Sequence, residues 1–317
     1  MNQLTFRNGD IIDAIGLGTW KSETGEVYQA VREAIKVGYT HIDCAWIYHN
    51  ENEIGQAFRD AFADGDITRD RLFVTSKLWN SFHAPEDVET ALRESLNALQ
   101  LDYIDLYLIH WPIAHQPGVT FSEDASGFAP IEDYPIANTW KAMEALVDQG
   151  LVKHIGVSNF NIPKIKKLME TARITPEMNQ VESHPLLAQP DLFKFCQENN
   201  ILYTAYSPLG SRDRAAGMKD ADEPDMFEIP RIKAIAEKHG VHPAQILIKW
   251  AEERGSLVIP KSVNAARLKA NLLSAQIPLS DSEMYEINKL DMGYRYLNGK
   301  FWEREGGYYT AEGLWNE

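Results

Sequence analysis

The chain has 317 residues, of which 44% are hydrophobic and 24% charged, and its formal net charge is −15. This composition is typical of a soluble globular protein, and the negative charge disfavours nucleic acid or an anionic membrane as a partner. No apolar run approaches the roughly 18 residues of a membrane span, and the start at Met1 lacks signal-peptide character. The two cysteines, Cys44 and Cys196, provide no disulfide framework, so a cytoplasmic location is expected.

The chain opens with a hairpin signal and then alternates between strand-like and helix-like segments. Asn8-Gly9 lies between two short apolar runs and suits a tight turn. Strands are predicted at residues 15–18, 39–43, 72–77, 104–110, 152–157, 178–181, 201–205 and 257–259. Helices are predicted at residues 25–37, 51–63, 85–99, 136–147, 162–171, 190–198, 230–238, 243–254 and 265–273, with a last helix after the capping-box pair Ser280 and Glu283.

Eight strands interleaved with helices over this length favour a (β/α)8 TIM barrel, an α/β fold, with an N-terminal β-hairpin. We expect one domain over residues 1–317, with long loops at 113–135 and 207–229 on the C-terminal face and an irregular tail from Asp291. The alternative is a doubly wound sheet. It is disfavoured because no G-x-G-x-x-G follows an early strand, and Gly16-Leu17-Gly18 is only a fragment of that motif.

Three of the early strands end in an ionisable side chain. These residues are Asp43, Lys77 and His110, and Tyr48 follows Asp43 by five positions. Each one alone has a plain structural explanation, such as a cap, a solvated lysine or a core histidine. Because the C-terminal ends of barrel strands converge on one face, an acid, a phenol, an amine and an imidazole are expected to meet there. The pattern therefore predicts a proton-transfer site.

Several stretches of the chain resemble the aldo-keto reductases. They are HIDCAWIY at 41–48, TSKLW at 75–79, DYIDLYLIHWP at 102–112, IGVSNF at 155–160 and IPKSV at 259–263. The segment at 207–214 is similar to that of the aldehyde reductases in particular. The resemblance spans essentially the whole chain. It implies a barrel enzyme that reduces aldehydes, with aldose sugars among the substrates, by hydride transfer from NADPH.

The resemblance also implies catalytic roles. Tyr48 would be the general acid that protonates the carbonyl oxygen, and His110 would orient that oxygen. Lys77 would lower the pKa of the Tyr48 phenol, because a nearby ammonium favours the phenolate, and Asp43 would hold the lysine. No metal is expected, since none of the His and Asp spacings forms a ligand set.

Cofactor-binding residues follow from the same resemblance. The nicotinamide would stack on Tyr206, its carboxamide would be bound by Ser158, Asn159 and Gln180, and the pyrophosphate would lie against Ser207, Leu209 and Ser211. The 2′-phosphate would be bound by Lys261, Ser262, Val263 and Arg267 near a helix start, and the adenine by Asn271. Ala270 and Asn264 stand where the family often has Glu and Thr, so NADH remains as a weaker alternative cofactor.

The substrate pocket is expected to have aromatic walls. Trp20, Trp79 and Trp111 would line it, and apolar walls suit small aldehydes. Two alternatives remain. One is a non-catalytic cofactor-binding sensor or channel-associated subunit of the same fold, and the other is a steroid double-bond reductase. The intact catalytic set disfavours the first, and His110 disfavours the second, in which the family carries Glu at that position.

Overall fold

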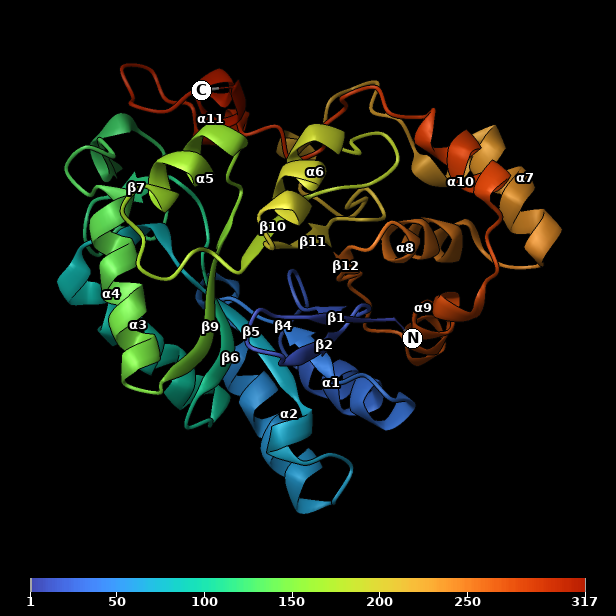
Figure 1. Ribbon diagram of the computed structural model, residues 1–317, viewed down its shortest axis with the longest axis horizontal. Coiled ribbons are helices and arrows are strands. Elements are labelled where there is room, and N and C mark those ends of the chain that lie inside the picture. The colour runs from blue at the N-terminus through green and yellow to red at the C-terminus, as the bar shows by residue number, and fades with distance from the viewer. Residues whose placement is uncertain (1, 317) are drawn as a thin grey trace.

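The computed structural model describes residues 2–316. Residues 1 and 317, the two ends of the expected domain, lie outside the described residues. At its centre is an eight-stranded parallel sheet in the order β3-β4-β5-β6-β9-β10-β11-β12, which curls between the surrounding helices (Figure 1). The strands are β3 (Leu17–Gly18), β4 (His41–Asp43), β5 (Phe73–Leu78), β6 (Ile104–Ile109), β9 (Val152–Ser158), β10 (Met178–Glu182), β11 (Leu202–Tyr206) and β12 (Leu257–Val258).

The first and last strands of this sheet meet each other. Parallel bridges join Ile15 to Val258 and Gly18 to Lys261, and the Gly16 N–H donates to the Val258 carbonyl at 2.9 Å. A side chain at Gly18 would place its Cβ 2.6 Å from the carbonyl oxygen of Ile259, so glycine permits this close approach. The C-terminal ends of all eight strands are thereby drawn around one mouth, as the barrel prediction requires.

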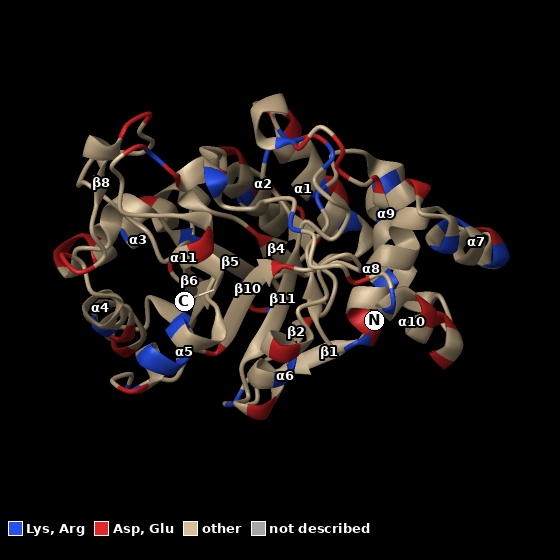
Figure 2. Ribbon diagram, turned by 90° about the horizontal axis from the view of Figure 1, so that it is seen from above, with Lys and Arg blue, Asp and Glu red and all other residues tan. Residues whose placement is uncertain are grey.

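Helices cover the outside of the sheet (Figure 1). They are α1 (Glu26–Val37), α2 (Glu51–Ala63), α3 (Pro85–Leu99), α4 (Ile136–Asp148), α5 (Ile162–Met169), α6 (Pro190–Glu198), α7 (Pro230–His239), α8 (Pro243–Glu253), α9 (Ala265–Leu273), α10 (Asp281–Asn288) and α11 (Ala311–Asn316). The apolar faces of α1 to α10 form one large core with the strands, and α11 packs in a separate cluster with Trp302. Charged residues lie mainly on the helices and loops (Figure 2), so the few charged side chains within strands stand out.

The N-terminal hairpin covers the end of the sheet opposite the mouth. It consists of β1 (Gln3–Thr5) and β2 (Ile11–Asp13), and Gly9 adopts a φ of 95° in the turn. The Phe6 ring stacks on His154 at 3.8 Å and on Phe73, the first residue of β5, at 5.6 Å. The hairpin therefore seals the N-terminal strand ends and leaves the other end for a site.

The tail is more regular than expected. Lys300–Trp302 form a 3-10 turn, and α11 follows at residues 311–316. The Trp302 and Leu314 side chains are buried, and the Lys164 ammonium donates to the carbonyl of Gly313 at 2.8 Å. The expectation of an irregular tail was wrong here because contacts with distant residues, absent from any local pattern, stabilise the helix.

The loop at 113–135 also contains a short hairpin, β7 (Ala114–His115) with β8 (Phe128–Ala129). Within residues 2–316, no helix is long and apolar enough to cross a membrane.

The packing of α2 on α3 predicts a sensitive glycine. An added Cβ at Gly55 would lie 2.2 Å from the backbone oxygen of Ala98, so Gly55→Ala must push the two helices apart. We expect a loss of about 1–3 kcal/mol in the free energy of unfolding, measured by denaturant titration. Gly217→Ala is the control, since a Cβ there meets open space. Equal stability of the two variants would contradict this account of the α2–α3 contact.

Candidate active site

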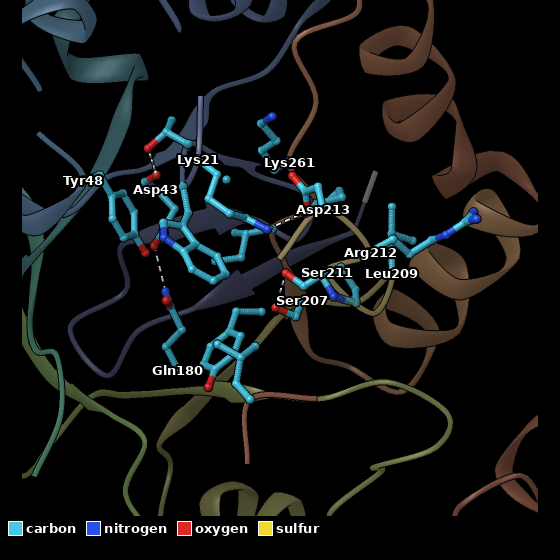
Figure 3. A pocket seen from close by; sticks show the side chains of 18 of the residues that line it. Lys21, Asp43, Tyr48, Gln180, Ser207, Leu209, Ser211, Arg212, Asp213 and Lys261 are labelled. Atoms are coloured by element: carbon cyan, nitrogen blue, oxygen red, sulfur yellow. Dashed lines mark hydrogen bonds and ion pairs between the residues drawn. The ribbon is translucent and has the colours of Figure 1, made fainter. Parts of the chain in front are cut away.

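A cavity of about 1280 Å³ lies at the C-terminal ends of the strands. It is lined by every site residue predicted from the sequence except Lys77, which lies behind its wall. The cavity runs from the tryptophan side near Tyr48 to the segment around Lys261 and the loop that carries Ser207 and Ser211 (Figure 3). The structure thus brings together residues that are separated by more than 200 positions in the chain.

A buried ion pair lies behind the cavity wall. The Lys77 side chain is completely buried, and its ammonium donates to Asp43 Oδ1 at 2.6 Å and to the Cys44 carbonyl at 2.8 Å. The same nitrogen lies 3.5 Å from the Tyr48 hydroxyl. Lys77 is on β5 and Asp43 ends β4, so the pairing of adjacent strands places the two charges side by side. Tyr48 follows in a 3-10 turn, Trp46–Tyr48.

Burial and neighbouring charges together set the protonation states at the mouth. It lowers the pKa of Lys77, but the attraction of Asp43 and Tyr48 outweighs it, so the pKa of this lysine is raised overall. Burial raises the pKa of Tyr48 to about 12, against the lowering effect of Lys77. Burial and then Lys77 hold the pKa of His110 well below its usual value. At neutral pH the site therefore contains an ammonium, a protonated phenol and a neutral imidazole.

The ammonium of Lys77 lowers the pKa of the Tyr48 phenol, as expected, but burial was not foreseen from the sequence. The net effect is a pKa raised to about 12. The reason is that desolvation of the phenolate exceeds the attraction of the lysine, which only limits the rise. Tyr48 and His110 both line the cavity, with their ring centres 5.9 Å apart, so a carbonyl oxygen between them has two neutral hydrogen-bond donors available.

The residues assigned to the nicotinamide carboxamide form a connected network. Gln180 Nε2 donates to Asp43 Oδ2, the carboxylate oxygen that does not accept from Lys77, at 2.7 Å (Figure 3). Ser158 Oγ donates to the Gln180 carbonyl at 2.7 Å. Asn159 Nδ2 donates to the His110 carbonyl at 2.9 Å, while the Tyr206 hydroxyl donates to Asn159 Oδ1 at 2.7 Å. These bonds were not foreseen from the sequence, because they join residues that lie on or directly after five different strands, β4, β6, β9, β10 and β11.

Unpaired cations lie at the far end of the cavity. Lys261 and Arg267 line it, and across residues 2–316 neither has an acidic side chain within ion-pair distance. Asn264 caps α9 by accepting from the Arg267 N–H at 3.0 Å, and it donates its own N–H to Ser262 Oγ at 3.2 Å. In a chain of net charge −15, two unpaired cations beside a helix start fit an anionic group such as a phosphate.

Two residues that line the cavity form an ion pair that was not predicted from the sequence. Lys21 and Asp213 pair at 2.5 Å, and they lie above Ser207 and Ser211 as seen in Figure 3. The loop that carries Asp213 bends through left-handed conformations at Ser207, Gly210 and Ser211. No sequence signal pointed to this contact, since the partners are 192 residues apart in two irregular segments.

The cavity has aromatic walls, and it also has charged lining residues that were not predicted. Trp20, Trp79 and Trp111 line the cavity as expected. The tail and the 113–135 loop add further lining residues, namely Phe121, Glu123, Phe301, Trp302 and Arg304. The two segments are fastened together, because Arg304 Nη2 donates to the Ser122 carbonyl at 2.6 Å. In the part of the chain that is described, no group of three or more His, Cys, Asp or Glu residues is placed to hold a metal ion.

Comparisons with known proteins agree with this geometry. The model of the aldo/keto reductase family matches residues 14–292. The chain is 49% identical over 317 residues to the aldo/keto reductase slr0942 of Synechocystis, covering 100% of this chain and 97% of that protein. It is 47% identical to human aldo-keto reductase family 1 member A1, covering 96% and 95%.

The chain belongs to the aldo-keto reductase family. Among solved structures, the aldose reductase of Schistosoma japonicum matches with a TM-score of 0.87 and 39% identity, over 95% of this chain and 96% of that one. The protein is therefore an oxidoreductase of this family that acts on carbonyl compounds, and the family resemblance seen in the sequence is confirmed.

The buried ion pair of this reductase predicts a pH-dependent loss of stability. Asp43→Asn leaves the Lys77 ammonium buried without its counter-charge, which costs about 3–5 kcal/mol in the free energy of unfolding near neutral pH. In the wild type the pKa of Lys77 is raised, so its contribution is complete below the unfolded lysine value of about 10.4 and is lost as pH rises through the folded value. In the variant the unpaired lysine sheds its proton more readily, so the deficit shrinks as pH rises.

Denaturant titrations from pH 6 to pH 10 measure this effect. Asp148→Asn is the control, because it removes a carboxylate that pairs with Arg173 on the exposed surface, and it should stay within about 0.5 kcal/mol of the wild type. A deficit in the Asp43 variant that is the same at every pH would show that the lysine charge is not its cause.

Proposed function

We propose that this protein reduces aldehydes, with aldose sugars among them, to alcohols with NADPH, and that Tyr48 is the general acid. The observation that carries the proposal is the protonated Tyr48 phenol at the cavity wall, 3.5 Å from an ammonium that Asp43 fixes. The bound cofactor would supply the hydride, because no protein side chain donates one. We infer a cytoplasmic enzyme whose partner is a small molecule rather than nucleic acid or a membrane.

Each catalytic residue has a distinct task in this proposal. Tyr48 gives its proton to the carbonyl oxygen as the carbonyl carbon is reduced, and the phenolate left behind recovers a proton from solvent. Lys77 stabilises that phenolate, since its charge is held close to the phenol oxygen and shielded from water. Asp43 keeps the lysine charged and in place. His110, which is neutral, donates a hydrogen bond that orients the carbonyl oxygen.

The cofactor assignments rest on the shape and chemistry of the cavity. Tyr206 offers a flat ring, and Ser158, Asn159 and Gln180 are held by their network where a carboxamide would lie. The Ser207–Ser211 backbone borders the groove for a pyrophosphate. Lys261 and Arg267 would favour NADPH over NADH through its 2′-phosphate, with Ser262, Val263 and Asn271 around it, and NADH would remain a weaker alternative.

Substrate class follows from the walls near Tyr48. The indoles of Trp20, Trp79 and Trp111 suit an apolar or aromatic aldehyde, and the similarity to an aldose reductase structure supports sugars as further substrates. A non-catalytic sensor subunit is not favoured, because such a protein has no need for a buried charge behind a phenol. Turnover of a panel of aldehydes, followed by the loss of NADPH absorbance, distinguishes the two readings.

Tyr48→Phe tests the general acid. The ring still packs, but the proton donor is lost, so we expect kcat for aldehyde reduction to fall by at least about 10²–10⁴-fold. The Kd for NADPH, measured by quenching of protein fluorescence, should change little. Tyr285→Phe, which alters an exposed tyrosine, is the control. Near wild-type turnover in the Tyr48 variant would exclude this residue as the acid.

Arg267→Ala tests the phosphate site. Loss of a charge-assisted bond of roughly 1.5–3 kcal/mol should raise the Kd for NADPH about tenfold or more and leave the Kd for NADH little changed. Lys269→Ala removes the same charge from α9 at a residue that does not line the cavity, so it should preserve the preference. Equal weakening of both dinucleotides by Arg267→Ala would show that the 2′-phosphate lies elsewhere.

A further inference from the structure

Another buried carboxylate, Glu182, lies at the end of β10 but does not line the cavity. Its Oε1 accepts from the Tyr296 N–H at 2.7 Å and from His184 Nε2 at 2.8 Å, and its Oε2 accepts from the Leu297 N–H at 2.8 Å. Burial alone would raise the pKa of Glu182, but these hydrogen bonds and the nearby Arg295 lower it, so the carboxylate stays charged. A fully buried anion thus fixes two consecutive backbone groups of the C-terminal segment.

Tyr296 connects this anchor to the loop at 207–229. Its hydroxyl donates to the Pro224 carbonyl at 2.5 Å, and the Arg214 guanidinium lies 5.2 Å above its ring. A Cβ at Gly210 would lie 3.1 Å from the same ring, so the loop backbone rests directly on it. Other residues of this loop line the proposed pyrophosphate groove. The loop at 207–229 therefore packs against Tyr296. We call it the cofactor-side loop, because it borders the proposed pyrophosphate groove.

Leu297 connects the anchor to the substrate side. It lines the cavity, and it begins the segment that supplies Phe301, Trp302 and Arg304 to the wall. This segment runs from α10 towards α11 across the top of the molecule (Figure 1), and Trp315 Nε1 on α11 donates back to the Asn298 carbonyl at 2.7 Å. We call the lining residues Leu297, Phe301, Trp302 and Arg304 the substrate-side wall. This wall begins at Leu297, one of the two residues whose backbone N–H groups are bound by Glu182.

We propose that Glu182 is a positioning residue that holds the cofactor-side loop and the substrate-side wall in a fixed relation through Tyr296 and Leu297. This role rests on the proposed function, since the two sides matter together only if cofactor and aldehyde share the cavity. Glu182 reaches neither ligand, because it is buried behind the wall. Its removal should loosen both sides at once, whereas removal of the Tyr296 hydroxyl should loosen the loop alone.

The first test compares Glu182→Gln with a matched buried glutamate. Glu144 accepts the backbone N–H groups of Arg173 and Ile174 at 2.7 and 2.8 Å, and it is 6% exposed and outside the cavity wall. Glu182→Gln should speed NADPH dissociation in stopped flow, and raise KM for benzaldehyde, each about threefold to tenfold, because hydrogen bonds to a charged group are the strong ones. The hydride-transfer rate in a single turnover at saturating aldehyde should stay within about twofold of the wild type. Glu144→Gln should leave all three quantities unchanged.

Tyr296→Phe separates the two sides. It removes the bond to Pro224 but retains the ring and both backbone bonds to Glu182, so NADPH should dissociate faster while KM for benzaldehyde is unchanged. This variant removes a single hydroxyl group, so it tests the effect on the loop even if Glu182→Gln does not fold. An NADPH dissociation rate equal to that of the wild type in Tyr296→Phe would overturn the proposed support of the loop by Tyr296.

A readout without ligands separates this proposal from the proposed function. Trypsin should cut the tail after Lys300 or Arg304 faster in Glu182→Gln than in the wild type or Glu144→Gln, whether or not any aldehyde is reduced. No turnover by the wild type, with fast cleavage in Glu182→Gln, would reject the proposed function and leave the anchor standing. The proposed role of Glu182 would be overturned if Glu182→Gln matched the wild type in cleavage rate, NADPH dissociation rate and KM. It would also be overturned if its changes were no larger than those of Glu144→Gln.

Discussion

The ion pair between Lys77 and Asp43 is the interaction on which the rest of the site depends. An ammonium that is completely buried is tolerable only with a carboxylate in contact, and Asp43 provides one at 2.6 Å. The second oxygen of Asp43 accepts from Gln180, which lies across the sheet on β10. The single carboxylate thus couples the lysine behind Tyr48 to the network proposed to bind the carboxamide. Its geometry exists only because the curled sheet brings β4 and β10 to the same mouth.

The sequence predicted the parts of the site that are attached to regular elements. Asp43, Lys77 and His110 were placed at strand ends because buried parallel strands are recognisable as apolar runs, and the structure brings all three together. It did not reveal Lys21 with Asp213, or Glu182 with Tyr296, since each contact involves an irregular segment and a partner far away in the chain. The helix α11 was missed for the same reason. The raised pKa of Tyr48 was missed because residue type does not reveal burial.

Charge is distributed unevenly in this protein, and that distribution bears on the chemistry. The chain carries a net charge of −15, yet Lys261 and Arg267 line one end of the cavity, and among the described residues neither has an acidic partner within ion-pair distance. An anionic ligand is drawn to this local excess of cations, although the whole molecule repels it at long range. The acidic surface therefore does not conflict with a phosphate-bearing cofactor, because screening reduces the distant charges far more than those in the groove.

The phenol of Tyr48 is a weak acid before any ligand is bound, since burial raises its pKa to about 12. A proton donor of that strength transfers its proton only if the phenolate is stabilised as it forms. In the proposed mechanism, the ammonium of Lys77 would meet this need. It is already charged, oriented by Asp43 and hidden from water, so no solvent would have to reorganise during the transfer. The same burial that weakens the acid in the resting protein would strengthen the attraction in the proposed transition state. Stability and the proposed catalysis at this mouth would therefore depend on the same ion pair.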